Sequence, residues 1–154
     1  MASFVTENAV FEFPEGREMV DEDRARELLA GCEHITAPTE IRLSNKSYSL
    51  GAATLIAEKL RSFENLVVAD ISDIIAGRHE DEALQVLKTI CDAIADKKLE
   101  VVNVSDNALG KKGVIACQGI LKGKHIKVRI LFNNVMISSI STRQCPFAET
   151  LLLQ

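Results

Sequence analysis

The chain has 154 residues, a formal net charge of −4, and 47% of its residues are hydrophobic. This length suits one domain or part of a repeat array. No apolar run reaches the roughly 18 residues that a membrane-spanning helix needs, and the N-terminal segment lacks the basic start and apolar stretch of a secretory signal. We therefore expect neither a membrane span nor secretion.

The charge is unevenly distributed along the chain. Residues 1–106 hold 21 acidic and 11 basic side chains, whereas residues 107–148 hold seven basic side chains and no acidic one. A basic segment can bind nucleic acid. However, aromatic residues make up only 5% of the chain, too few for a platform on which bases stack. We expect no nucleic-acid binding.

The cysteines and histidines show no spacing typical of a metal site or a catalytic triad. No pair of cysteines has the CxxC spacing of a zinc site. We expect buried free thiols in a reducing compartment, surface histidines, no metal and no cofactor. The residues concerned are Cys32, Cys91, Cys117, Cys145, His34, His79 and His125.

The first element expected in chain order is a helix in residues 20–32, VDEDRARELLAGC. Three carboxylates near its start suit the positive end of the helix dipole, and Gly31 suits its end. A repeat array needs a cap over the open core of its first repeat. We assign residues 1–40 to this N-terminal helical cap.

Three similar stretches follow, and each joins a strand to a helix through a short turn. They are IRLSNKSYSLGAATLIAEKL from Ile41, ADISDIIAGRHEDEALQVLKTI from Ala69 and VVNVSDNALGKKGVIACQGIL from Val101, with a weaker fourth start, RILFNNVMIS, from Arg129. Strands are expected over residues 41–43, 68–71 and 101–104, each followed by an amphipathic helix with apolar residues at i, i+3 and i+4. The apolar positions expected in the core are Leu55, Ile56, Leu60, Leu84, Leu87, Ile90, Cys91, Ile94, Val114, Cys117 and Leu121.

The spacing of these stretches is that of a leucine-rich repeat. Ser44 and Ser72 are 28 residues apart, Ser72 and Ser105 are 33 apart, and Ser105 and Asn133 are again 28 apart. In such repeats the strands line one face and the helices line the other. We therefore predict an α/β leucine-rich-repeat solenoid fragment, with about three and a half repeats in residues 41–134.

Residues 135–154 depart from this pattern. Pro146 and a β-branched, Ser/Thr-rich run argue against a regular helix. We expect an irregular or disordered tail.

The stretches SNKSYSLGAA, DISDIIAGRHEDEAL and NVSDNALGKKGV resemble the opening repeats of Ran GTPase-activating proteins, over about residues 41–121. The resemblance implies a crescent-shaped array that binds the small GTPase Ran in its GTP-bound form and accelerates GTP hydrolysis, in the cytoplasm or at the nuclear periphery, as part of nucleocytoplasmic transport. It implies an activator without a nucleotide site of its own. The sequence agrees, because it has no GxxxxGK[ST] phosphate loop.

The resemblance also implies site residues. Arg78, at the Gly-Arg corner before an acidic helix start, would hold Ran. An asparagine one 28-residue period after Asp106, which is Asn134, would orient the catalytic machinery of the GTPase. The other candidates for partner binding lie in the strand-to-helix turns: Asn45, Asp73, Asp106 and Asn107.

Each candidate also has a structural explanation. A surface salt bridge from Arg78 to Glu80, Asp81 or Glu82 would contribute only about 0–1 kcal/mol. The Asn and Asp side chains, Asn134 included, can instead bond the turn backbone after each strand. At the level of function, the alternatives are a non-catalytic leucine-rich-repeat interaction module and an inactive truncated product.

Overall fold

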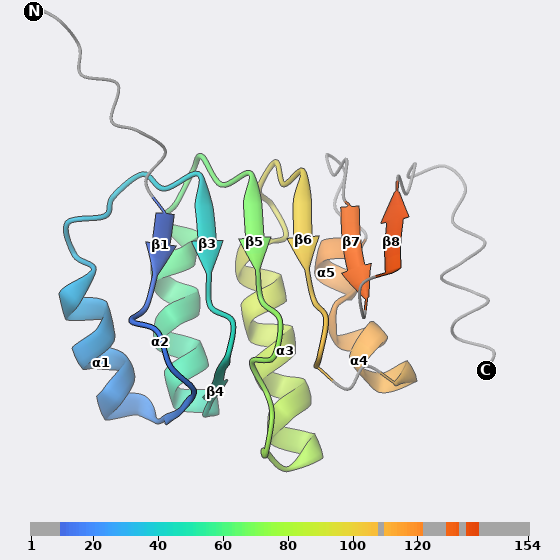
Figure 1. The fold of residues 1–154 in the computed structure, drawn as a ribbon, viewed down its shortest axis with the longest axis horizontal. Helices are drawn as coiled ribbons and strands as arrows, with labels where there is room; N and C mark the ends of the chain where they lie inside the picture. Colours follow the sequence, from blue (N-terminus) through green and yellow to red (C-terminus); the bar gives the residue numbers. More distant parts are fainter. Residues whose placement is uncertain (1–9, 108–109, 122–128, 133–134, 139–154) are drawn as a thin grey trace, which may run out of the picture.

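The structure is a computed structural model that describes residues 10–107, 110–121, 129–132 and 135–138, with backbone alone for Leu121 and the last two ranges. It is a mixed α/β protein whose main sheet has the strand order β1-β3-β5-β6-β7-β8 (Figure 1). The strands of this sheet are β1 (Val10–Glu12), β3 (Glu40–Arg42), β5 (Val68–Asp70), β6 (Val101–Asn103), β7 (Arg129–Phe132) and β8 (Val135–Ser138). A second, two-stranded sheet pairs β2 (Glu18–Val20) with β4 (Lys46–Tyr48).

The three strands predicted from the repeats are neighbours and run parallel, as expected. β3 pairs with β5, and β5 pairs with β6, both in parallel. β1 and β7 extend the parallel sheet on either side. The prediction that these segments form adjacent parallel strands is therefore confirmed.

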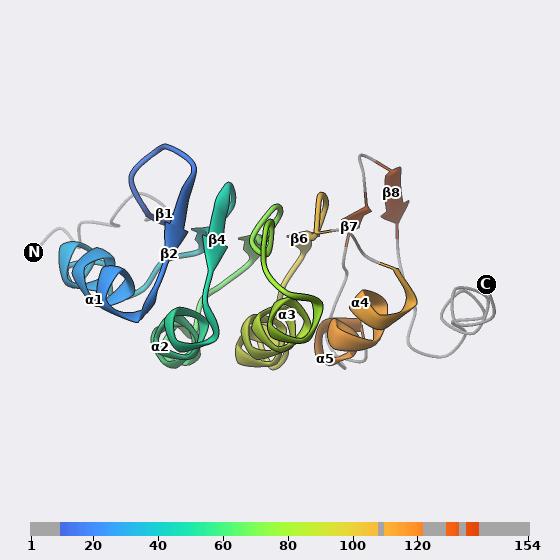
Figure 2. The same cartoon turned by 90° about the horizontal axis from the view of Figure 1, so that it is seen from below.

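All the described helices cover the same face of the sheet, as Figure 2 shows. They are α1 (Glu22–Gly31), α2 (Leu50–Arg61), α3 (Glu80–Ile94), α4 (Lys111–Ala116) and α5 (Gln118–Leu121). Because each helix follows its own strand and returns to the same side, consecutive helices pack side by side. α1 contacts α2, α2 contacts α3, and α3 contacts α4.

The core lies between the sheet and this helix layer. The central residues of four parallel strands, Phe11, Ile41, Ala69 and Val102, are aligned by the strand register and are fully buried. The helices contribute the apolar positions that recur at i, i+3 and i+4. Of the predicted core residues, Ile56, Leu60, Leu87, Ile90, Cys91, Ile94, Val114 and Cys117 are buried, and Leu55 and Leu84 are partly buried against the core.

Three of the four cysteines lie in the described residues, and all three are buried free thiols, as predicted. A hydrogen bond with Cys117 and complete burial raise the pKa of the Cys91 thiol. Burial raises the pKa of the Cys32 thiol as well. Cys145 lies outside the described residues.

The N-terminal segment holds more than the predicted helix. The helix is present as α1, with the Asp21 side chain accepting a hydrogen bond from the backbone N–H of Arg24 (2.9 Å). The segment also supplies β1 and β2, which sequence reasoning missed because three-residue strands are too short to show a clear alternation. β1 pairs with β3 and α1 packs on α2, so this segment covers one side of the first predicted repeat.

The C-terminal part also differs from expectation. Residues 135–154 were expected to be irregular, yet Val135–Ser138 form β8, which pairs with β7 in the antiparallel direction. Residues 139–154 lie outside the described residues. Within the described part of the chain, no helix is long and apolar enough to span a membrane.

Candidate partner-binding site

Four segments join the carboxyl ends of parallel strands to the helices that follow them, and we call them the turn edge. They are residues 13–21 after β1, 43–49 after β3, 71–79 after β5 and 104–107 after β6. Five predicted site residues lie on this edge: Asn45, Asp73, Arg78, Asp106 and Asn107. Asn134 lies outside the described residues.

Backbone hydrogen bonds join neighbouring segments of the turn edge. The N–H of Leu43 donates to the carbonyl of Asp70, and the N–H of Ile71 donates to the carbonyl of Asn103, both at 2.9 Å. The sheet ladder thus continues past the ends of the strands, and this holds the turns at a regular spacing.

The backbone conformation of the turn explains the Asn or Asp that follows the serine of each repeat. Asn45, Asp73 and Asp106 have φ values of 62°, 48° and 59°, in the left-handed region. Asn and Asp adopt this region more readily than other non-glycine residues. The recurrence of these residue types therefore follows from the shape of the turn, independently of any partner.

Asn107 is a structural residue of the turn edge in this geometry. Its side chain accepts a hydrogen bond from the N–H of Ile74 (2.9 Å) and donates to the carbonyls of Ile71 (2.7 Å) and Val104 (3.1 Å). The residue is only 2% exposed. Its amide group is therefore committed to the backbone of its own turn and of the preceding one.

Arg78 is less exposed than the sequence suggested. Its Nε donates to Oγ of Ser47 (3.0 Å), and its Nη2 donates to the carbonyl of Ser47 (2.8 Å). Its side chain is only 14% exposed. The arginine thus bonds to β4, in the preceding segment of the turn edge.

The acidic run after Arg78 contacts both neighbouring units. Oε1 of Glu82 accepts the N–H of Leu50 at the start of α2 (3.1 Å) and lies 3.9 Å from Nη1 of Arg78. Glu80 instead pairs with Lys112 of α4, and this pairing raises the pKa of the lysine. Of the three carboxylates proposed as salt-bridge partners for Arg78, only Glu82 lies within ion-pair distance in the described structure.

The first segment is joined to the second through Lys46, which is 4% exposed. Its Nζ donates to the carbonyl of Gly16 (2.8 Å) and to Glu18 (3.1 Å). A hydrogen bond from Arg24, assisted by Lys46, holds the pKa of Glu18 below its usual range, although partial burial opposes this. Hydrogen bonds of this kind offset the cost of burying a polar group.

An exposed ion pair joins the first segment to the third. Nη2 of Arg17 lies 3.0 Å from Oδ1 of Asp73, and the Arg17 side chain is 61% exposed. Asp73 is therefore paired, and it is the predicted site residue that contacts the first segment.

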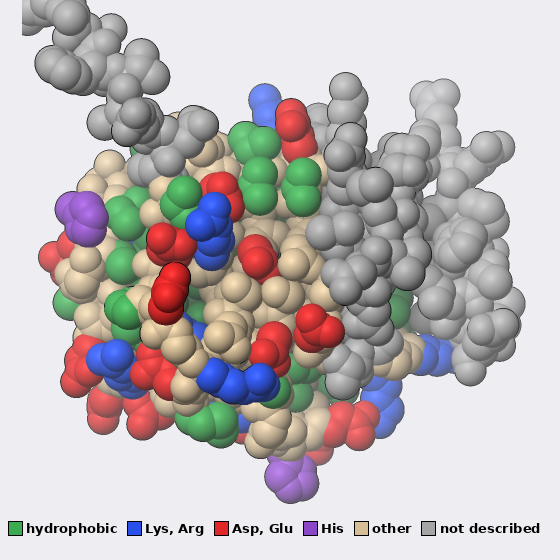
Figure 3. Space-filling view, viewed as in Figure 1, with side chains coloured by type: hydrophobic (Ala, Val, Ile, Leu, Met, Phe, Trp, Pro, Cys, Tyr) green, Lys and Arg blue, Asp and Glu red, His purple; other side chains and the backbone are tan. Residues whose placement is uncertain are grey.

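The open face of the sheet bears charges of both signs. Arg42 binds Glu40 at 2.6 Å and Glu12 at 3.3 Å. Figure 3 shows acidic and basic side chains interspersed on this face. A partner that docks on the turn edge and this face would meet a mixed charge pattern, which favours polar recognition.

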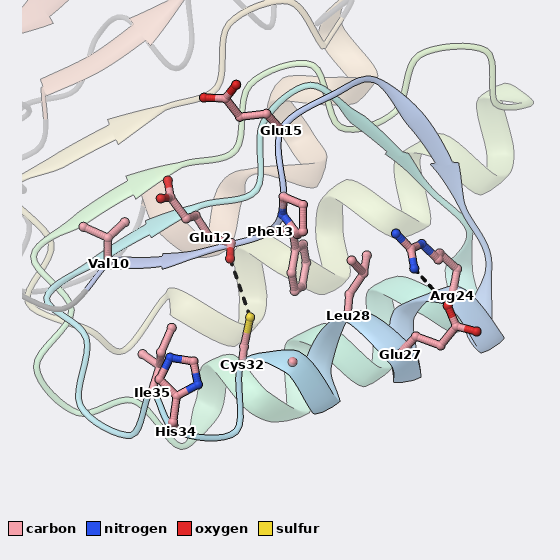
Figure 4. A pocket seen from close by; sticks show the side chains of 12 residues that line it. Val10, Glu12, Phe13, Glu15, Arg24, Glu27, Leu28, Cys32, His34 and Ile35 are labelled. Atoms are coloured by element: carbon pink, nitrogen blue, oxygen red, sulfur yellow. Dashed lines mark hydrogen bonds and ion pairs between the residues drawn. The ribbon is translucent and has the colours of Figure 1, made fainter.

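A separate open groove of about 650 Å³ lies between β1 and α1. Figure 4 shows the Cys32 thiol at its centre, donating to the carbonyl of Glu12 (3.6 Å), and the Arg24–Glu27 pair at one end. None of the predicted site residues lines this groove. The turn edge therefore remains the candidate site.

Sequence reasoning missed three residues that hold the site together: Arg17, Lys46 and Ser47. Ser47 and Arg78 are 31 residues apart in the chain, so no local pattern connects them. The only available signal was their position in successive turns of the repeat. Among the described residues, no group of three His, Cys, Asp or Glu side chains could hold a metal ion.

Comparison with known proteins shows which proteins this chain is similar to. No family model matches the sequence. RAN GTPase-activating protein 1 of Arabidopsis thaliana is 39% identical over 111 residues, which are 71% of this chain and 21% of that protein. RAN GTPase-activating protein 2 of the same plant is 43% identical over 108 residues, which are 69% of this chain and 20% of that protein.

The chain is related to the Ran GTPase-activating proteins. Ran GTPase-activating protein 1 of Xenopus laevis, 31% identical over 100 residues, extends the similarity to an animal member and covers 64% of this chain and 17% of that protein. The chain thus spans about a fifth of the length of the curated relatives it matches. The resemblance found in the repeats is confirmed by this similarity.

Proposed function

We propose that this chain binds the small GTPase Ran in its GTP-bound form and stimulates GTP hydrolysis. The observation that carries the proposal is the 39–43% identity to two proteins named as activators of the Ran GTPase, over about 70% of the chain. The turn edge supports it, because four predicted site residues, Asn45, Asp73, Arg78 and Asp106, lie there on consecutive segments.

On this proposal, the fold is a stretch of leucine-rich repeats. The parallel strands in chain order and the helices on one face support it, and so does the 28-residue spacing. Residues 1–40 would form the N-terminal cap, residues 41–134 the repeats, and the residues after 134 a segment outside them. β1 and α1 suit a cap because they cover one side of the first repeat.

The proposed mechanism leaves the nucleotide chemistry to the GTPase. Hydrolysis by small GTPases depends on positioning the attacking water and on stabilising the charge of the transferred phosphoryl group. Asn134 would help to orient the GTPase residue that places the water, and Arg78 would hold the partner. The chain would need neither a nucleotide site nor a cofactor of its own, and no nucleic acid would take part.

The second candidate is a non-catalytic interaction module. The observation that favours it is the backbone role of the turn residues, since Asn45, Asp73 and Asp106 adopt left-handed φ values and Asn107 bonds the turn backbone. Such a module would bind its partner along the same turn edge without changing the rate of hydrolysis.

Single-turnover hydrolysis by GTP-loaded Ran, with increasing amounts of the chain, tests the proposal. We expect the rate to rise and then saturate, with no effect on an unrelated small GTPase. Binding without acceleration would establish the interaction module. If the chain neither binds Ran nor accelerates hydrolysis, both candidates are contradicted and the inactive truncated product remains.

We also propose that the protein acts in the cytoplasm or at the nuclear periphery, where it would serve nucleocytoplasmic transport. A fluorescent fusion tests this location. Accumulation inside the nucleus would contradict it.

A further inference from the structure

The guanidinium group of Arg78 is held along one edge only. Its Nε and Nη2 bind Oγ and the carbonyl oxygen of Ser47 at 3.0 and 2.8 Å. A guanidinium has five N–H donors in a rigid plane. The hydrogen bonds to Ser47 use two of them, and among the described residues Nη1 has no hydrogen-bond partner.

The nearest opposite charge to Nη1 is Glu82, and that carboxylate is already engaged. Its Oε1 lies 3.9 Å from Nη1, which is an ion-pair distance but longer than a hydrogen bond. The same oxygen accepts the N–H of Leu50 at 3.1 Å, which ties it to the start of α2. Glu82 therefore neutralises part of the arginine's charge without occupying its donors.

We propose that Ser47 is a positioning residue for Arg78, because it fixes the guanidinium so that its other edge binds a carboxylate of the partner, and that the charge of Glu82 weakens this attraction. This inference rests on the proposed binding of Ran by the turn edge. An arginine whose rotamer is already fixed loses less entropy when it binds. An edge bonded to Ser47 and an edge with unused donors together suit the two-point recognition of a carboxylate.

Ser47→Ala tests the positioning role of the serine. The change removes the Oγ acceptor but keeps the carbonyl, so Arg78 retains one of its two bonds. We expect about a fivefold weaker affinity for GTP-loaded Ran, because a guanidinium held by one bond instead of two loses more rotamer freedom when it binds. The saturated hydrolysis rate should not change. Ser47→Thr, which keeps the hydroxyl, should restore the affinity.

Glu82→Gln tests the opposing charge and distinguishes positioning from mere folding. Glutamine keeps an oxygen acceptor for the N–H of Leu50 but has no charge. We expect about twofold tighter binding of Ran, because the partner's carboxylate no longer meets a negative charge beside Arg78. A purely structural role predicts weaker or unchanged binding and a lower melting temperature.

The experiment measures the dependence of single-turnover hydrolysis on the concentration of the chain, and the melting temperature, for the unaltered chain and each variant. Ser62→Ala is the matched control, since this exposed serine lies at the end of α2 and its hydroxyl donates to the carbonyl of Lys59. If the unaltered chain neither binds nor activates Ran, the proposed function and this inference both fail. The proposed roles of Ser47 and Glu82 alone are overturned if the unaltered chain is active but Ser47→Ala binds Ran with the same affinity as Ser62→Ala. They are also overturned if Glu82→Gln does not bind Ran more tightly than the unaltered chain.

Discussion

Asn107 shows how one side chain can hold two successive turns together. Its side-chain amide forms hydrogen bonds with three backbone groups, two of them in the turn after β5, and the residue is buried. A backbone group that loses such a partner away from water is left unsatisfied. The sequence pattern placed Asn107 among the candidates for partner binding, but its bonds are those of a residue that stabilises the turn edge.

Replacing Asn107 should therefore lower stability sharply. Asn107→Ala leaves the N–H of Ile74 and two carbonyls without their partner, so we expect a loss of about 3 kcal/mol in the free energy of unfolding. Urea denaturation measures it. Asn65→Ala, at an exposed position, is the control and should change stability by less than about 0.5 kcal/mol. Equal effects of the two substitutions would show that the buried amide is not needed.

Gly77 provides the change of direction before α3. Its φ is +75°, a value at which a side chain is strained, although a Cβ there would meet no atom within 4 Å. Gly77→Ala should thus destabilise the protein by about 1–2 kcal/mol through backbone strain alone. Gly31→Ala, at the end of α1 and also free of close contacts, should be neutral or stabilising by up to about 1 kcal/mol. Thermal denaturation of both variants compares them, and a neutral Gly77→Ala would refute the strain argument.

At the scale of elements, side chains join each strand-to-helix segment to its neighbours. Glu82 of α3 binds the start of α2, and Glu80 of the same helix pairs with Lys112 of α4. Acidic side chains at a helix start also suit the dipole of α3 itself. The acidic run after Arg78 therefore has structural roles toward both neighbouring helices.

The pairing of β2 with β4 includes an ion cluster that makes stability depend on pH. Arg24 and Lys46 lower the pKa of Glu18 below its usual value of 4.5. The ionised form is thus favoured in the folded state, so its contribution is present above the usual pKa and is lost as pH falls through the lowered one. Stability from this group should decline in the acidic range below about pH 4.5.

Comparison of Glu18→Gln with the unaltered chain isolates this effect. At pH 7 the variant should be less stable, because Lys46 and Arg24 lose a charged partner. Below about pH 4.5 the difference should shrink toward zero, since Glu18 becomes neutral in the unaltered chain too. Denaturation at several pH values measures the difference, with Glu64→Gln, an exposed carboxylate, as the control. A difference that is constant with pH would contradict the assignment to the Glu18 charge.

At the scale of the whole molecule, two residues are proposed to contribute differently to the activation of Ran: Arg78 to binding and Asn134 to the rate of hydrolysis. Arg78→Ala should raise the concentration of chain needed for half-maximal stimulation by about tenfold or more, since it removes a positioned charge. Asn134→Ala should leave that concentration nearly unchanged and lower the saturated rate, because a group that orients the reaction acts mainly in the transition state. Arg61→Ala, at the far end of α2, should behave like the unaltered chain. If Arg78→Ala instead abolishes the saturated rate and Asn134→Ala has no effect, Arg78 is the catalytic group.

The sequence by itself determined the order of the three repeat strands β3, β5 and β6, the helix faces that pack on the core, and the recurrence of Asn or Asp in the turns. These features are local: periodicity fixes which face of a helix is buried, and a left-handed turn selects Asn, Asp or Gly wherever it recurs. The family resemblance was also readable, because it lies in contiguous motifs around Arg78 and Asp106.

Only the tertiary structure decided what the candidate side chains touch. Arg78 is largely covered because Ser47, 31 residues earlier, comes within hydrogen-bond distance when two turns stack. Lys46 is buried because β2 lies beside β4. Such contacts depend on the distance and register between units, which no local propensity encodes. For the same reason, β1 and β2 became apparent only when their pairing with β3 and β4 was seen.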